Sequence, residues 1–186
     1  MGPCSSQRLT LDLAVVMVKK KDGTLRMCID FRALRKKTIK NRYPIPRIYE
    51  LMDELHESIF FSNIDLRFGY HQIWMREQDI PKTAFRCHYG HFEFVSMPFG
   101  LKNEPDTFRS CMNNIFHKKI RKFVLVFFDD ILIYSKTWKE HLHHLEEVLK
   151  ILHDQSLFAK LSKCEFGLTE LYTSLVNMVW RWICRK

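Results

Sequence analysis

Two adjacent aspartates, Asp129 and Asp130, separate two short apolar segments, residues 123–128 and 131–134. Removing a carboxylate from water without a partner is costly, and neighbouring like charges disfavour each other's ionised form. No Lys or Arg lies within five residues of Asp129 on either side. Either the pair forms a hairpin turn, where Asp is favoured for local reasons, or it binds a divalent cation.

A third carboxylate, Asp65, lies near the end of another apolar segment, residues 60–66. A strand beside the hairpin would bring all three carboxylates to one edge of a sheet. Three oxygen donors suit a hard cation such as Mg²⁺. Two such ions about 3.5–4 Å apart can activate an attacking hydroxyl and stabilise the leaving oxygen in phosphoryl transfer.

The positive charge of the chain is concentrated in residues 19–47. This segment has eleven basic residues against Asp22 and Asp30, which accounts for the whole formal net charge of +9. Such a block is either a phosphate-facing surface or a solvated basic face. A basic hairpin tip beside an acidic cluster would hold the triphosphate of an incoming nucleotide. An acidic cluster together with a basic arm is the general layout of a polymerase site.

Hydrophobic spacing and turn residues predict the elements that must position these groups. The expected elements are strands over 14–18, 25–30 and 60–66, a hairpin over 84–95, a helix over 48–56, and a helix after Pro105 ending in the basic residues 118–122. Thr137 and Glu140 have the spacing of a capping box. The helix that they open has an apolar stripe formed by Leu142, Leu145, Val148, Leu149 and Leu152. This mixture of hairpins and helices predicts an α+β domain.

Composition excludes several classes of protein. The hydrophobic fraction is 46%, as in globular domains, and no apolar run approaches the roughly 18 residues of a membrane span, so no membrane partner is expected. The N-terminus does not resemble a signal peptide. Six scattered cysteines without a C-x-x-C pair argue against a zinc site. His141, His143 and His144 have no matching ligands elsewhere, so we expect them at the surface or flank of their helix.

These motifs, in this order and spacing, resemble the reverse transcriptase of gypsy-class LTR retrotransposons. The resemblance runs from about Ala14 to Gly167. It is carried by KKKDGTLRMCIDFRAL at 19–34, YPIP at 43–46, DLRFGYHQ at 65–72, KTAF at 82–85, MPFGL at 97–101 and FDDILIYS at 128–135.

The resemblance implies a right-hand polymerase of fingers and palm, with an antiparallel sheet and packed helices. The implied activity is that of an RNA-directed DNA polymerase, a nucleotidyltransferase that extends a primer on an RNA or DNA template from dNTPs. Asp65, Asp129 and Asp130 match the catalytic carboxylates that hold two Mg²⁺ ions, or Mn²⁺ in their place. The carbonyl of Leu66 is implied to face the metal.

Further roles follow from the same resemblance. Tyr70 matches the aromatic steric gate that rejects a ribose 2′-hydroxyl. Arg26, with Lys20 or a neighbouring lysine, matches the residues of the fingers that bind the triphosphate. Phe99 and Gly100 match the segment beside the nucleotide pocket. The oligomeric state is left open.

The sequence also departs from the family pattern. Phe68 stands where a small residue is usual, and three charged residues, Glu104, Asp106 and Arg109, replace uncharged ones. After Tyr172 the resemblance ceases, so we expect no thumb. The expected division is a poorly ordered lead-in over 1–13, a fingers and palm domain over 14–167, and a divergent tail over 168–186.

An alternative is a truncated, catalytically inactive remnant of a retroelement that retains at most nucleic-acid binding through residues 19–47. By family, the compartment would be a cytoplasmic particle or the nucleus. A stray copy could equally belong to an organelle such as the mitochondrion.

Overall fold

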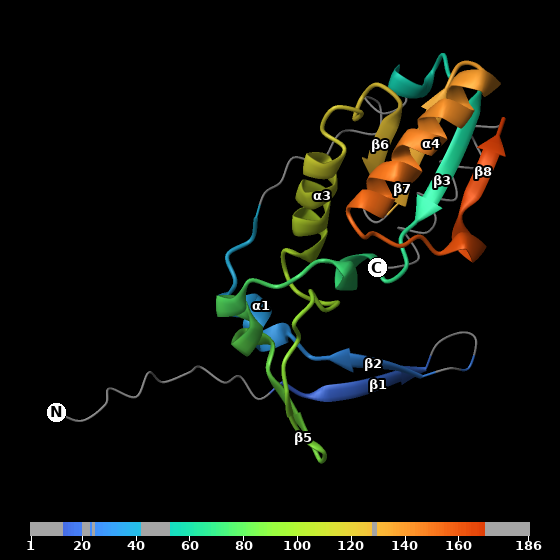
Figure 1. The fold of residues 1–186 in the computed structure, drawn as a ribbon. Coiled ribbons are helices and arrows are strands. Elements are labelled where there is room, and N and C mark those ends of the chain that lie inside the picture. The colour runs from blue at the N-terminus through green and yellow to red at the C-terminus, as the bar shows by residue number, and fades with distance from the viewer. Residues whose placement is uncertain (1–12, 20–22, 24, 42–52, 128–129, 170–186) are drawn as a thin grey trace. The chain divides into compact units, whose positions relative to one another are not determined.

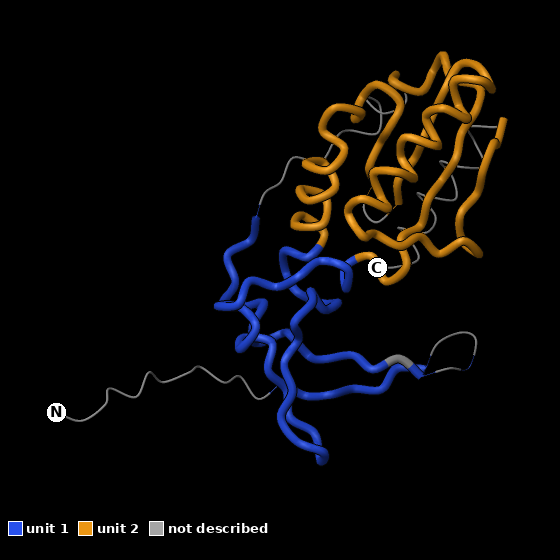
Figure 2. The backbone as a smooth tube through the Cα atoms, in the orientation of Figure 1, with its two compact units in different colours: residues 1–41, 70–104 blue, residues 42–69, 105–186 orange. Residues whose placement is uncertain are grey.

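The computed structural model describes residues 13–19, 23, 25–41, 53–127 and 130–169 (Figure 1). The chain forms two compact units, and each is built from two separate segments (Figure 2). Unit 1 contains residues 1–41 and 70–104, and unit 2 contains residues 42–69 and 105–186. Within the described ranges, no helix has the length and apolar character needed to cross a membrane.

Unit 1 consists of two hairpins with short helices between them. Its elements are β1 (Val15–Lys19), β2 (Leu25–Ile29), α1 (Arg32–Lys37), η1 (Gly69–Gln72, whose first residue belongs to unit 2), η2 (Glu77–Thr83), β4 (Phe85–Cys87) and β5 (Gly90–Phe92). β1 pairs with β2, and β4 pairs with β5, both in antiparallel register. The core of the unit is formed by Leu13, Phe31 and Phe85, which are buried together.

Unit 2 is built on a four-stranded sheet with the order β6-β7-β3-β8, in which every neighbouring pair is antiparallel. Its elements are β3 (Phe60–Asp65), α3 (Glu104–Ile115, whose first residue belongs to unit 1), β6 (Val124–Phe127), β7 (Asp130–Ser135), α4 (Trp138–Asp154), η3 (Leu161–Lys163) and β8 (Glu165–Leu168). The helix α3 buries Phe108 and Met112 completely, and Phe116, just beyond its end, is buried as well.

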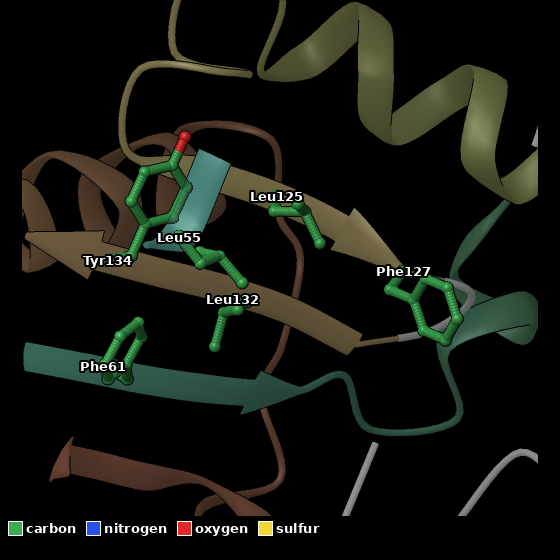
Figure 3. Close-up of a cluster of buried hydrophobic side chains, with 6 residues drawn as sticks. All are labelled: Leu55, Phe61, Leu125, Phe127, Leu132 and Tyr134. Atoms are coloured by element: carbon green, nitrogen blue, oxygen red, sulfur yellow. The ribbon is translucent and has the colours of Figure 1, made fainter. Parts of the chain in front are cut away.

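The two faces of this sheet have different coverings. Buried side chains of one face form a cluster with Leu55: Phe61, Leu125, Phe127, Leu132 and Tyr134 (Figure 3). Successive residues of a strand point to opposite faces, so Ser62 and Ile64 lie on the other side. There α4 packs against β3 and β7 (Figure 1).

The α+β architecture and most of the expected elements are confirmed. The capping box is present, since Glu140 N donates to Thr137 Oγ at 3.3 Å and Thr137 N donates to Glu140 Oε2 at 3.2 Å. The expected helix over 48–56 lies mostly outside the described residues. Leu13, which the sequence assigns to the lead-in, is only 4% exposed and belongs to the core of unit 1.

One helix prediction is wrong and another is only partly confirmed. The helix after Pro105 ends at Ile115 and does not reach residues 118–122; Lys119 forms an ion pair with Glu147 of α4 instead. In α4 the buried side is made by His141, Val148 and Leu152, whereas Leu142 and Leu149 are 50% and 43% exposed. The predicted stripe is confirmed at Val148 and Leu152, whereas His141 takes the place of Leu142 at its start, because a purely apolar pattern passes over a histidine.

Candidate active site

Asp65 and Asp130 face each other across two neighbouring strands. Asp65 is the last residue of β3 and Asp130 is the first of β7, and the antiparallel register pairs them directly. Directly paired residues of an antiparallel sheet have Cβ atoms about 4.5–5.5 Å apart. The expectation that Asp65 lies beside the acidic pair at the hairpin is therefore confirmed for Asp130.

Both carboxylates are enclosed by the protein. Asp65 is 5% exposed and Asp130 is 4% exposed. Phe127 of β6 is the partner of Asp130 on its other side and is itself buried. Like charges directly opposite each other in a sheet are destabilising, so this arrangement is costly unless a cation balances it.

The third predicted carboxylate, Asp129, lies outside the described residues, as does Phe128. In the part of the chain that the structure describes, no group of three or more His, Cys, Asp and Glu side chains is arranged to hold a metal ion. The described residues thus include two of the three predicted carboxylate ligands. Oxygen-only donors of this kind fit a hard cation such as Mg²⁺ or Mn²⁺.

The backbone at the end of β3, on either side of Leu66, is fixed by the segment that follows α4. Lys160 N donates to Asp65 O at 2.8 Å, and Arg67 N donates to Phe158 O at 2.8 Å. Leu66, predicted to present its carbonyl to the metal, is 3% exposed and forms a bridge with Ala159. This segment also brings Lys163 Nζ to 3.3 Å from Asp65 Oδ2. No sequence pattern indicated Lys163, because 98 residues separate it from Asp65.

Phe68, the first departure from the family pattern, has a φ of +52°. This left-handed conformation is unfavourable for a residue with a large side chain. The Phe68 ring is 64% exposed, and the guanidinium of Arg67 lies 5.9 Å from its centroid.

Three predicted nucleotide-site residues come together within unit 1. Tyr70 is 8% exposed and meets Phe99 edge-on, with ring centroids 5.2 Å apart. Gly100, the next residue, has a φ of +97°, which favours glycine. Its N–H donates to Glu104 Oε2 at 2.5 Å. Glu104, the second departure from the pattern, is 7% exposed. Its hydrogen bond with Gly100 fixes the backbone beside Phe99.

The triphosphate-binding residues are less fully described. Arg26 lies on β2 opposite Val18 of β1, while the position of its side chain is outside what the structure describes. Lys20 lies outside the described residues altogether. Their roles stay predictions.

A buried polar cluster occupies the other end of β3 and β7. Ser62 Oγ lies 2.7 Å from His141 Nε2, and Ser135 Oγ lies 3.0 Å from His141 Nδ1 and 2.8 Å from His144 Nδ1. The prediction that His141 is a surface or flank residue is wrong, since it is 0% exposed. Its spacing from Val148 and Leu152, on one helical face, is the signal that could have found it.

The pKa values of both histidines in this cluster are depressed. Burial lowers the pKa of His141, and the nearby His144 lowers it further. Burial likewise lowers the pKa of His144, although Glu140 and Glu147 oppose that shift. The cluster is therefore a neutral hydrogen-bonded network between α4 and the sheet of unit 2.

Opposed buried aspartates at the ends of two central antiparallel strands are the arrangement that the sequence predicts for a nucleic-acid polymerase. Residues 18–178 match the family model described as reverse transcriptase (RNA-dependent DNA polymerase), and the chain belongs to this family. Enzymes of this family use divalent metal ions.

Relatives in other organisms agree with this assignment. The chain is 45% identical over 155 residues to the retrovirus-related Pol polyprotein from transposon 297 of Drosophila melanogaster, covering 81% of this chain and 15% of the polyprotein. It is 48% identical over 128 residues to an RNA-directed DNA polymerase homolog of Oenothera berteroana, covering 67% of this chain and 90% of that protein. The resemblance to retrotransposon reverse transcriptases is confirmed, while the gypsy class stays a prediction.

Solved structures confirm the polymerase fold. The foamy viral protease-reverse transcriptase, solved in complex with double-stranded DNA, matches with a TM-score of 0.77 and 25% identity. The match covers 87% of this chain and 28% of the viral one. This chain therefore corresponds to a limited portion of both the viral protein and the Drosophila polyprotein.

Proposed function

We propose that this chain is the fingers and palm portion of an RNA-directed DNA polymerase. In this proposal it transfers nucleotides from dNTPs to the 3′-hydroxyl of a primer paired with an RNA or DNA template. The observation that carries the proposal is the register of β3 and β7, which sets two buried carboxylates, Asp65 and Asp130, directly opposite each other.

Asp65, Asp129 and Asp130 would hold two Mg²⁺ ions, with the Leu66 carbonyl nearby. The ions, when bound, lower the pKa of the attacking hydroxyl and stabilise charge on the leaving pyrophosphate. The protein's own part is to fix the carboxylates. Burial keeps competing water from Asp65 and Asp130, and the bond from Lys160 N to Asp65 O holds the end of β3 in place.

In unit 1, Tyr70 would select the sugar. Its ring is held by the edge-on contact with Phe99, so it presents a fixed surface to the nucleotide. Lys20 and Arg26 would bind the triphosphate through charge-assisted hydrogen bonds.

Primer extension with Mg²⁺ on an RNA template, using the full chain, tests this function. Wild type should extend the primer, and a double variant carrying Asp129→Asn and Asp130→Asn should not. An Asp154→Asn variant is the matched control, because its carboxylate lies at the exposed end of α4. Extension by the double variant at the wild-type rate would refute the assignment.

Binding of a template–primer at increasing salt distinguishes an active polymerase from the alternative, an inactive remnant that only binds nucleic acid. A protein that binds nucleic acid equally well with and without the aspartates, while neither form extends a primer, would be an inactive remnant. A Tyr70→Ala variant adds an independent test of the polymerase function. It should incorporate ribonucleotides more readily relative to deoxyribonucleotides, whereas an unchanged ratio would remove Tyr70 from the sugar site.

A further inference from the structure

In the sheet of unit 2, a lysine side chain lies beside the paired aspartates of β3 and β7. Lys163 Nζ lies 3.3 Å from Asp65 Oδ2. The two partners differ in accessibility, since the side chain of Asp65 is 8% exposed and that of Lys163 is 42% exposed. A buried carboxylate is thus paired with an ammonium that remains in contact with solvent.

The segment that carries Lys163 is attached to the backbone at Asp65 and at Arg67. Lys160 N donates to Asp65 O, and Phe158 O accepts from Arg67 N, each at 2.8 Å. Lys163 ends the short helix η3, and Lys163 N donates to Lys160 O at 2.8 Å. The backbone at Lys163 is therefore fixed, while its flexible side chain can change conformation.

The contact itself is loose. Charge-assisted N–H···O bonds are usually about 2.7–2.9 Å long, and the distance here is 3.3 Å. A lysine offers a single point charge on a flexible stem, unlike the rigid fork of arginine. Such a partner can balance a carboxylate and still be displaced from it.

A divalent cation at the same carboxylate would compete with this ammonium. Asp65 and Asp130 are paired across the sheet, and either cation relieves their repulsion. Two cations at one carboxylate repel each other strongly in a partly buried place. We propose that Lys163 is the resident counter-ion of Asp65, which holds the carboxylate in the metal-free protein and is displaced when the divalent cation binds. The inference rests on the metal site of the proposed function.

Binding of Mn²⁺ alone, without nucleotide or primer, provides the first test. We compare wild type with Lys163→Met, Lys163→Arg, Lys160→Met and Asp65→Asn by electron paramagnetic resonance of free Mn²⁺. Lys163→Met should bind Mn²⁺ about threefold to tenfold more tightly, since it removes the competing charge. Lys160→Met removes the same charge from the same segment, at an exposed side chain, and should change the affinity by less than about twofold. Lys163→Arg should bind Mn²⁺ no more tightly than wild type.

The metal-free protein provides the second test. In the presence of a chelator, Lys163→Met should lower the midpoint of thermal unfolding by about 2–4 °C. This loss should disappear in the Asp65→Asn background, because the partner charge is gone. Lys160→Met should show no such dependence on Asp65.

The outcomes separate this inference from the function on which it rests. If Mn²⁺ binds at a site that Asp65→Asn abolishes, but Lys163→Met and Lys160→Met behave alike, the counter-ion role is overturned and the polymerase site stands. A Mn²⁺ affinity that Asp65→Asn leaves unchanged would overturn the metal site and the inference together. Absence of coupling between Lys163 and Asp65 in the chelated protein would also overturn the counter-ion role.

Discussion

The buried polar groups at the two ends of the β3–β7 pair differ in whether they satisfy one another. At one end, His141 forms hydrogen bonds with both Ser62 and Ser135 inside the protein. At the other, Asp65 and Asp130 place like charges face to face. A buried polar network that satisfies itself stabilises the fold, whereas opposed buried carboxylates lower stability and are retained for a ligand. The comparison separates a structural cluster from a functional one within a single sheet.

The largest expected effect is on catalysis at the acidic end. Asp130→Asn should reduce primer extension by roughly 10³-fold or more, since several kcal/mol of charge stabilisation by the metal is lost. The same change removes one of two opposed charges, so the free energy of unfolding should stay constant or rise by up to about 1 kcal/mol. Single-turnover extension and urea unfolding measure the two quantities. A large loss of stability would show that Asp130 has the structural role assigned here to the opposite end.

At the histidine end, the largest effect should be on stability. His141→Ala should lower the free energy of unfolding by about 2–3 kcal/mol, because it leaves a cavity and removes a partner from both Ser62 and Ser135. Urea unfolding of the metal-free protein measures this loss. His153→Ala is the control, since that side chain is 91% exposed, and its effect should stay within about 0.5 kcal/mol. Equal effects of the two variants would contradict the network.

The pH dependence of stability should also come from this end. Burial lowers the pKa of both His141 and His144 below the usual 6.5, so the unfolded chain takes up protons before the folded one does. Stability is then fully present above about pH 6.5 and is lost as the pH falls toward the depressed values. Each histidine contributes a loss of at most about 1.4 kcal/mol per pH unit.

Urea unfolding between pH 7.5 and pH 5.5 measures this loss, with His141→Gln as the comparison. The variant should lose less stability over this interval than wild type. A wild-type stability that rises as the pH falls would contradict the depressed pKa values.

The smallest expected effect concerns Tyr134, which neighbours Ser135. Burial raises the pKa of Tyr134 to about 12, and among the described residues its hydroxyl has no hydrogen-bond partner. Tyr134→Phe should leave the free energy of unfolding unchanged or raise it by up to about 1 kcal/mol. Thermal unfolding checks this, and a loss above about 1 kcal/mol would show that the hydroxyl makes a stabilising hydrogen bond on its own face of the sheet.

The two ends of the β3–β7 pair could not be predicted equally well from the sequence. The pairing of Asp65 with Asp130 could be predicted, because each borders an apolar strand and neighbouring strands align their ends. Strand and hairpin positions followed from the same apolar runs. His141 could not be placed by a pattern that counts only apolar residues, although its position on the face of Val148 and Leu152 was visible in retrospect.

Other features depend on contacts that local patterns do not encode. Lys163 meets Asp65 only because the segment after α4 adds β8 to the far side of β3. Glu104 has the look of a disruptive charge in the sequence, yet it accepts a hydrogen bond from Gly100 N. The role of Lys163 arises from tertiary pairing, whereas the contact of Glu104 is only four residues away and is not evident from residue type alone. Asp129, the remaining member of the predicted triad, stays a prediction.

The division of each unit into two chain segments has a consequence for biosynthesis. On a ribosome, β3 emerges before the second segment of unit 1, and only afterwards do β7 and β8 appear to flank it. The nascent chain must therefore keep β3 unpaired on both sides until β7 and β8 have been made, which invites aggregation. Any shortened product that stops before β7 would expose both borders of this strand and should be a substrate for chaperones or proteases.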